Sequence, residues 1–92
     1  VAVVGETVIN GRIDRLIVEP GLVRAIDFKT GRQVPRDETG VPIPHLRQMA
    51  HYRAALQAIF PGARVEVSLL FTHAPRFITL SDAILAPYYP AS

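Results

Sequence analysis

The fold is decided by residues 11–29, which read GRIDRLIVEPGLVRAIDFK. Ile, Leu and Val dominate the two halves, residues 12–19 and 22–29, and this composition favours two β-strands. Between them, Pro20-Gly21 is a strong turn signal. The stretch therefore predicts a β-hairpin.

The register of this hairpin places charged side chains together. If Pro20-Gly21 supplies the two central turn residues, counting outward puts Asp14 opposite Asp27. Side chains alternate along a strand, so Asp27 and Lys29 share one face, and directly opposed residues share a face with Cβ atoms roughly 5 Å apart. An L-Pro-Gly turn prefers type II geometry, whereas two-residue hairpins prefer mirror-image turns, so a bulge that shifts the pairing is an open alternative. In the simple register, the two acids and the lysine converge.

Both faces of the predicted hairpin are apolar. The face of the acids also carries Leu16, Val18, Val23 and Ala25, and the opposite face carries Ile13, Ile17, Ile26 and Phe28. Strands that are apolar on both faces are typical of sheets covered on both sides. We therefore expect cover on both faces of this sheet.

Two carboxylates on a covered sheet repel each other and lose solvation. Either one takes a proton or a cation arrives. Oxygen ligands of this kind suit Mg²⁺ or Mn²⁺, and Mg²⁺ retains several waters, so it needs few protein carboxylates. The competing interpretation is a structural ion-pair cluster of Asp14, Asp27 and Lys29.

The remaining chain predicts an α/β (α+β) domain, with a mixed sheet flanked by helices. In chain order we expect a strand over 1–9 broken at Gly5, the hairpin, a loop over 33–44, a helix over 44–60, a strand over 65–72, a short strand over 77–80 and a short helix capped by Ser81-Asp82. Pro61-Gly62 ends the longer helix.

The predicted helix carries two polar side chains one turn apart. Gln48 and Tyr52 share a helix face, where an amide and a hydroxyl suit contact with phosphate or with a metal-bound water. Alternatively, Tyr52 is a partly buried core aromatic. His45, His51 and His73 have no metal-binding spacing, and we expect them to be surface or packing residues.

Composition limits the class of protein. Ninety-two residues allow one small domain, and 49% hydrophobic with 20% charged residues fits a folded chain. No long uncharged apolar run predicts a membrane span. The absence of cysteine excludes disulfides, thiolate nucleophiles, zinc–thiolate sites and a cysteine-ligated iron–sulfur cluster within these residues, and fits a cytoplasmic protein.

Charge and the termini add less. The net charge of +2 is a weak argument for nucleic acid. Arg32, Arg36, Arg47 and Arg53 follow the acidic residues, either as a DNA-facing set or as a solvated surface. There is no Gly-rich phosphate loop and no nucleophile elbow. The chain opens at Val1 in a strand-like sequence, and we expect it to be a piece of a longer polypeptide.

Three short motifs together resemble a known family. GRIDR at 11–15, IDFKTG at 26–31 and QMAHY at 48–52 look like the RecB-type branch of the PD-(D/E)xK nucleases, and the core motifs span 11–52. The surrounding sequence over 46–62 is similar to the C-terminal nuclease of AddA-type double-strand-break-repair helicase–nucleases. The resemblance covers roughly residues 5–72.

This resemblance implies a fold and an activity. It implies a restriction-endonuclease-like sheet over a single nuclease domain, 1–92, whose N-terminal helix lies outside the chain. It implies Mg²⁺- or Mn²⁺-dependent, exonucleolytic hydrolysis of DNA in the cytoplasm of a bacterium. The partners would be DNA, the rest of the helicase chain and an AddB-type subunit, without a membrane and without an iron–sulfur cluster in this segment.

The resemblance also implies residue roles. Asp14, Asp27 and Lys29 would be catalytic. The two carboxylates and the backbone carbonyl of Phe28 would bind the metal, and Lys29 would orient or activate the attacking water. Gln48 and Tyr52 would support the site and contact the DNA backbone.

One departure from the family matters. Members usually carry a His metal ligand on a helix upstream of the first motif, and this chain starts too late to include it. The alternatives are a Cas4-like or phage-type exonuclease, a catalytically silent DNA-binding or scaffolding domain with the same fold, and an unrelated interaction module. The missing cysteines argue against the first, and the retained Asp14, Asp27 and Lys29 argue against the second.

Overall fold

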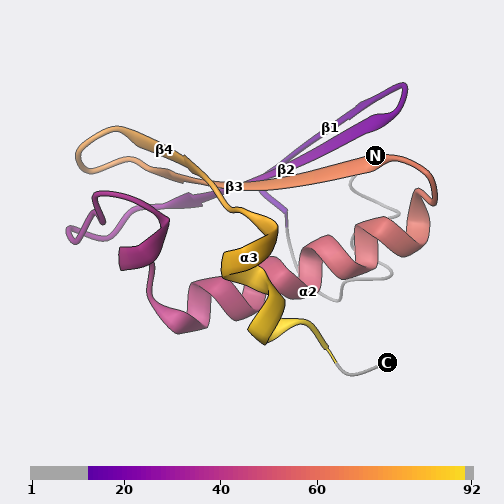
Figure 1. The fold of residues 1–92 in the computed structure, drawn as a ribbon. Helices are drawn as coiled ribbons and strands as arrows, with labels where there is room; N and C mark the ends of the chain where they lie inside the picture. The colour runs from indigo at the N-terminus through magenta and orange to yellow at the C-terminus, as the bar shows by residue number, and fades with distance from the viewer. Residues whose placement is uncertain (1–12, 91–92) are drawn as a thin grey trace.

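The computed structural model describes residues 13–90 as one mixed four-stranded sheet with helices on one face (Figure 1). Its elements are β1 (Arg15–Glu19), β2 (Leu22–Lys29), the 3₁₀ helix η1 (Glu38–Gly40), α2 (Ile43–Ile59), β3 (Arg64–Phe71), β4 (Arg76–Thr79), α3 (Asp82–Leu85) and the 3₁₀ helix η2 (Ala86–Tyr88). The sheet order β1-β2-β3-β4 follows the chain, and the predicted α+β class is confirmed.

The hairpin forms in the simple register. Glu19 pairs with Leu22 and Arg15 pairs with Ile26, so there is no bulge or longer loop. Gly21 has φ +76°, which the second central residue of a type II turn requires and which glycine adopts without strain. The Pro-Gly sequence thus sets the turn geometry without shifting the strands.

The sheet becomes mixed because α2 connects two parallel strands. β2 and β3 pair in parallel along their full lengths, whereas β4 returns antiparallel to β3. Pro44 sits in the first turn of α2, where its missing N–H costs nothing. The helix ends before Pro61-Gly62, and Gly62 has φ +89°. The carboxyl ends of β2 and β3 therefore meet at one end of the sheet, close to the start of α2.

The core lies between α2 and one face of the sheet. Alternate residues of β2 and β3 point towards the helix, and residues at helical spacing on α2 point towards the sheet. The fully buried side chains include Val23, Val67, Leu69, Met49 and Leu56. Burial of this two-layer core fixes the face on which Asp27 and Lys29 lie, since both continue the same alternation along β2.

The expected cover on both faces is seen on one face only among the described residues. α2 and α3 both lie below the sheet in Figure 1. On the other face Phe28, Leu70 and Phe77 form a row across three strands, with Phe28 41% and Phe77 55% exposed. The apolar pattern was read correctly as two-sided, but residues 13–90 supply helices for one side.

Strand and helix ends differ slightly from the predictions. The main difference is β1, which begins at Arg15 rather than at residue 12, because the chain bends at Asp14. The strand expected over 1–9 lies outside the described residues. Ser81 caps α3 as predicted, with its Oγ accepting a hydrogen bond from the Ile84 N–H at 3.3 Å. No helix in the described part of the chain has the length and apolarity needed to cross a membrane.

Because the core between α2 and the sheet is well packed, we expect a cavity there to lower the free energy of unfolding strongly. Leu56 is fully buried, so Leu56→Ala is expected to lower the free energy of unfolding by about 2–5 kcal/mol. Arg47→Ala on the exposed side of the same helix should change it by less than about 0.5 kcal/mol. Urea denaturation measures both, and equal effects would contradict the described packing.

Candidate active site

Lys29 and Asp27 form a largely buried ion pair near the carboxyl end of β2. Lys29 Nζ lies 2.6 Å from Asp27 Oδ2, and the two side chains are 18% and 9% exposed. They lie two residues apart on one strand, so alternation places both side chains on the sheet face that α2 covers. The strand, rather than a flexible loop, positions both groups.

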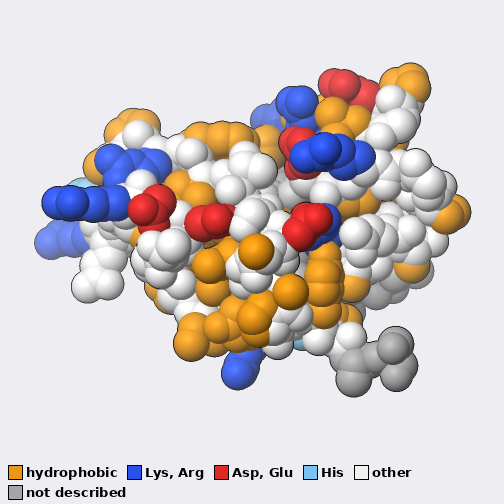
Figure 2. Space-filling view, viewed as in Figure 1, with side chains coloured by type: hydrophobic (Ala, Val, Ile, Leu, Met, Phe, Trp, Pro, Cys, Tyr) orange, Lys and Arg blue, Asp and Glu red, His pale blue; other side chains and the backbone are white. Residues whose placement is uncertain are grey.

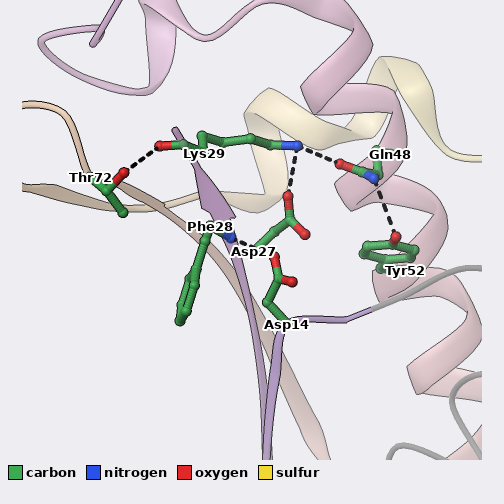
Figure 3. Close-up of polar contacts among 7 residues, drawn as sticks. All are labelled: Asp14, Asp27, Phe28, Lys29, Gln48, Tyr52 and Thr72. Carbon is green, nitrogen blue, oxygen red and sulfur yellow. Dashed lines mark hydrogen bonds and ion pairs between the residues drawn. The ribbon is translucent and has the colours of Figure 1, made fainter. Parts of the chain in front are cut away.

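Asp14 joins them from the bend before β1. Its Oδ2 accepts a hydrogen bond from the Phe28 N–H at 2.8 Å (Figure 3). This carboxylate takes the place of a ladder hydrogen bond, which explains why β1 starts only after Asp14, at Arg15. The convergence predicted for Asp14, Asp27 and Lys29 is thus found, although Asp14 reaches the site from a bend and not from within a strand.

The charge on Asp27 is not fully balanced. Burial raises the pKa of Asp27 above its ordinary value, the ion pair with Lys29 opposes that rise, and the adjacent Asp14 carboxyl adds to it. Lys29 therefore pairs with Asp27 while a second carboxyl group, that of Asp14, lies beside the same aspartate. A proton or a further cation relieves the repulsion that remains.

The donor set fits a small, hard divalent cation. Across residues 13–90 no group of three or more His, Cys, Asp or Glu side chains is arranged to hold a metal ion, so the two aspartates need a donor of another kind. The N–H and C=O of one residue in an extended strand point to the same side, so the Phe28 carbonyl lies on the edge where its N–H meets Asp14. Two carboxylates, one carbonyl and retained waters are the ligands that Mg²⁺ accepts.

Gln48 and Tyr52 extend the site onto α2. Gln48 Oε1 accepts a hydrogen bond from Lys29 Nζ at 2.9 Å, and Gln48 Nε2 donates to the Tyr52 hydroxyl at 3.2 Å (Figure 3). Tyr52 is 6% exposed, so its ring belongs to the core while its hydroxyl meets the polar chain. The interpretation of Tyr52 as a core aromatic is therefore confirmed, and its contact with phosphate or with a metal-bound water stays a prediction.

Two further residues at the site were not predicted. Thr72 donates its backbone N–H to the Lys29 carbonyl at 2.9 Å and holds the end of β2 against β3. His45 lies close enough to the ion pair to be affected by it, since burial lowers its pKa, Lys29 lowers it further and Asp27 opposes the change. The available signal for His45 was its position three residues before Gln48 on the helix.

The arginines divide into two groups. Arg53 is structural, since its guanidinium pairs with Asp82 and lies 5.8 Å from the centre of the Tyr89 ring. Arg36 and Arg76 line an open hollow of about 430 Å³ beside the exposed Phe77. Figure 2 shows basic side chains gathered at that end of the molecule. Arg32 and Arg47 are exposed as well, so of the four arginines predicted as a set only Arg53 lacks the exposure that contact with a polyanion requires.

The sequence that builds this site also matches a known protein family. The model described as the PD-(D/E)XK nuclease superfamily matches residues 1–83, which is most of the chain. No curated protein and no solved structure gives a significant match. The match includes every residue that converges at the site.

The raised pKa of Asp27 predicts a pH trend. A folded state that holds this proton more tightly than the unfolded state loses stability as pH rises from the ordinary aspartate range towards the folded pKa. Asp27→Asn has no carboxyl group to titrate and lacks that loss. Without divalent metal, its free energy of unfolding should therefore rise relative to that of the wild type as pH rises. Denaturation in urea between about pH 3 and pH 7 measures the difference.

Glu19→Gln, at the exposed hairpin tip, is the matched removal of one acid. A difference between Asp27→Asn and the wild type that stays constant or shrinks with rising pH would contradict the proposed charge imbalance.

Proposed function

We propose that this chain, which belongs to the PD-(D/E)XK nuclease superfamily, hydrolyses DNA phosphodiester bonds with a divalent metal held by Asp14 and Asp27. The observation that carries the proposal is the meeting of two carboxyl groups with a single ammonium group at the end of β2. Carboxylate oxygens held close together are the ligands that a hard divalent cation prefers.

We further propose a place within that superfamily. The order and spacing of the three motifs support the RecB-type branch, and the sequence over 46–62 supports an AddA-type helicase–nuclease that processes double-strand DNA ends. In such a protein the helicase, its ATP site and an AddB-type partner subunit lie outside these residues. The same proposal includes Mg²⁺-dependent exonucleolytic cleavage of DNA in the bacterial cytoplasm.

The metal ligands are proposed to be the two aspartates and the Phe28 carbonyl. A bound Mg²⁺ or Mn²⁺ supplies Lewis acidity, which lowers the pKa of a coordinated water and offsets charge on the phosphate. Asp14 is fixed by the Phe28 N–H and Asp27 by Lys29, so the carboxylates are oriented before metal arrives. The proton that Asp27 favours must leave first, so acid weakens metal binding.

Lys29 is proposed to orient the attacking water and steady the developing phosphate charge. Its ammonium group is held from both sides, by Asp27 and by the Gln48 amide. A fixed cation in a largely buried site loses little to reorganisation when charge develops. Tyr52 in turn holds Gln48, so a chain of three residues from α2 to β2 determines where the ammonium group sits.

The same site distinguishes a nuclease from a silent relative. A domain kept only for scaffolding has no need of an intact pair of acids with their lysine. The basic side chains of Arg36 and Arg76 near Phe77 support contact with DNA at the same end of the sheet. This arrangement favours an active nuclease over a binding domain.

Metal binding predicts a thermal shift. Mn²⁺ or Mg²⁺ at about a hundred times its Kd stabilises a binding protein by about 2.7 kcal/mol, which is roughly 10–20 °C in Tm for a domain of this size. We expect that shift for the wild type and none for Asp27→Ala. A differential scanning experiment measures both, and an equal response of the variant would remove Asp27 from the metal site.

Loss of the ammonium group predicts loss of cleavage. Lys29→Ala is expected to lower the rate of hydrolysis of a labelled oligonucleotide at least about a hundredfold, because it removes a cation that acts on the developing charge. Arg24→Ala, at an exposed cation on the same strand, should leave the rate unchanged. In a parent helicase, DNA-stimulated ATP hydrolysis should survive Lys29→Ala. Retained cleavage by the lysine variant would rule out the assigned role.

A further inference from the structure

The face of α2 that meets the site begins with a histidine. His45, Gln48 and Tyr52 stand at i, i+3 and i+7, which places them on one side of the helix. Gln48 contacts Lys29 and Tyr52 contacts Gln48, so this side of the helix is known to face β2. His45 is the member nearest the helix start, one turn before the contact with Lys29.

The surroundings of His45 show that its ring lies near the ion pair. Burial is the first cause of its lowered pKa, and the charges that act on it are Lys29 and Asp27. A lowered pKa keeps the imidazole neutral at physiological pH, with one nitrogen as donor and the other as acceptor. The ring is intermediate in exposure, so part of it remains open to solvent.

The ring has hydrogen-bonding capacity to spare. Within residues 13–90 no hydrogen bond joins the His45 ring to another group. By contrast, the Nδ1 of His51, on the outer side of the same helix, forms a hydrogen bond with the Arg47 carbonyl oxygen at 2.8 Å. Two histidines on one helix thus differ in direction and in use, which makes them a matched pair.

We propose that His45 is a substrate-binding residue of the nuclease site, and that its imidazole N–H donates a hydrogen bond to a DNA phosphate next to the bond that is cut. This inference rests on the proposed function. Lys29 and the aspartates face the reacting phosphate, whereas His45 lies one helical turn away at the partly exposed end of the same polar row. The contact adds a donor without adding a charge beside Lys29.

The substitutions separate donation from packing. His45→Phe keeps an aromatic ring and removes the donor, while His45→Gln keeps an N–H donor on a flexible chain. His51→Gln is the control on the outer side of α2. Neither of the two residues changed is a proposed metal ligand, so each of the three variants retains the metal site.

The first test is binding and turnover of a short labelled oligonucleotide. With Ca²⁺ to permit binding, His45→Phe should raise the Kd about three- to tenfold, as the loss of one hydrogen bond predicts, and His45→Gln should recover part of it. With Mg²⁺ the same variant should raise KM more than it lowers kcat. His51→Gln should match the wild type in every measurement.

The second test observes the ring directly. In NMR spectra of ¹⁵N-labelled imidazoles, titration with the oligonucleotide should shift the His45 signals and leave those of His51 in place. A wild type that neither binds metal nor cuts DNA would refute the proposed function itself. A wild type that cuts DNA, with His45→Phe equal to it in Kd and KM and with unshifted His45 signals, would refute the role of His45 alone.

Discussion

The structure depends on one electrostatic constraint: the exposed carboxyl group of Asp14 approaches the buried one of Asp27 at the end of β2, where Lys29 supplies an ammonium group between the sheet and the helix. Burial raises the pKa of Asp27, the ion pair with Lys29 opposes that rise, and the neighbouring Asp14, which is exposed, adds to it. A proton or a cation beside Asp27 relieves the repulsion between the two carboxyl groups. In the proposed nuclease this repulsion is the source of metal affinity, and therefore of chemistry.

The scaffold is arranged so that this contact cannot relax easily. β2 is central in the sheet, paired to β1 on one side and to β3 on the other, and Asp27 cannot turn away without breaking its pairing with Leu69 of β3. The Thr72 N–H fixes the end of the strand at Lys29. On the helix side of the sheet, Gln48 accepts a hydrogen bond from the lysine and Tyr52 holds Gln48 in place. A small core of α2 against one sheet face thus supports a polar site that is unfavourable without its cation.

Local sequence chemistry was enough to predict the geometry of the hairpin and its acids. The Pro20-Gly21 turn fixes the register, and strand alternation then determines the face of Asp27 and Lys29. The helix stripe of Gln48 and Tyr52 followed from helical spacing in the same way. These features depend on residues near one another in the sequence, or on periods of two and 3.6 residues that can be counted.

Long-range contacts were beyond such counting. The bend at Asp14 arises because its carboxylate binds the Phe28 N–H, a choice that strand composition does not reveal. The direction of His45 depends on how α2 is rotated over β2, and the link from Glu38 to Ser81 joins residues 43 positions apart. Diffraction from crystals grown with Mn²⁺ tests the central claim most directly. We predict an anomalous peak about 2.1 Å from an oxygen of Asp14 and of Asp27, whereas a peak held by other residues, or acids that point to opposite faces, would contradict the account.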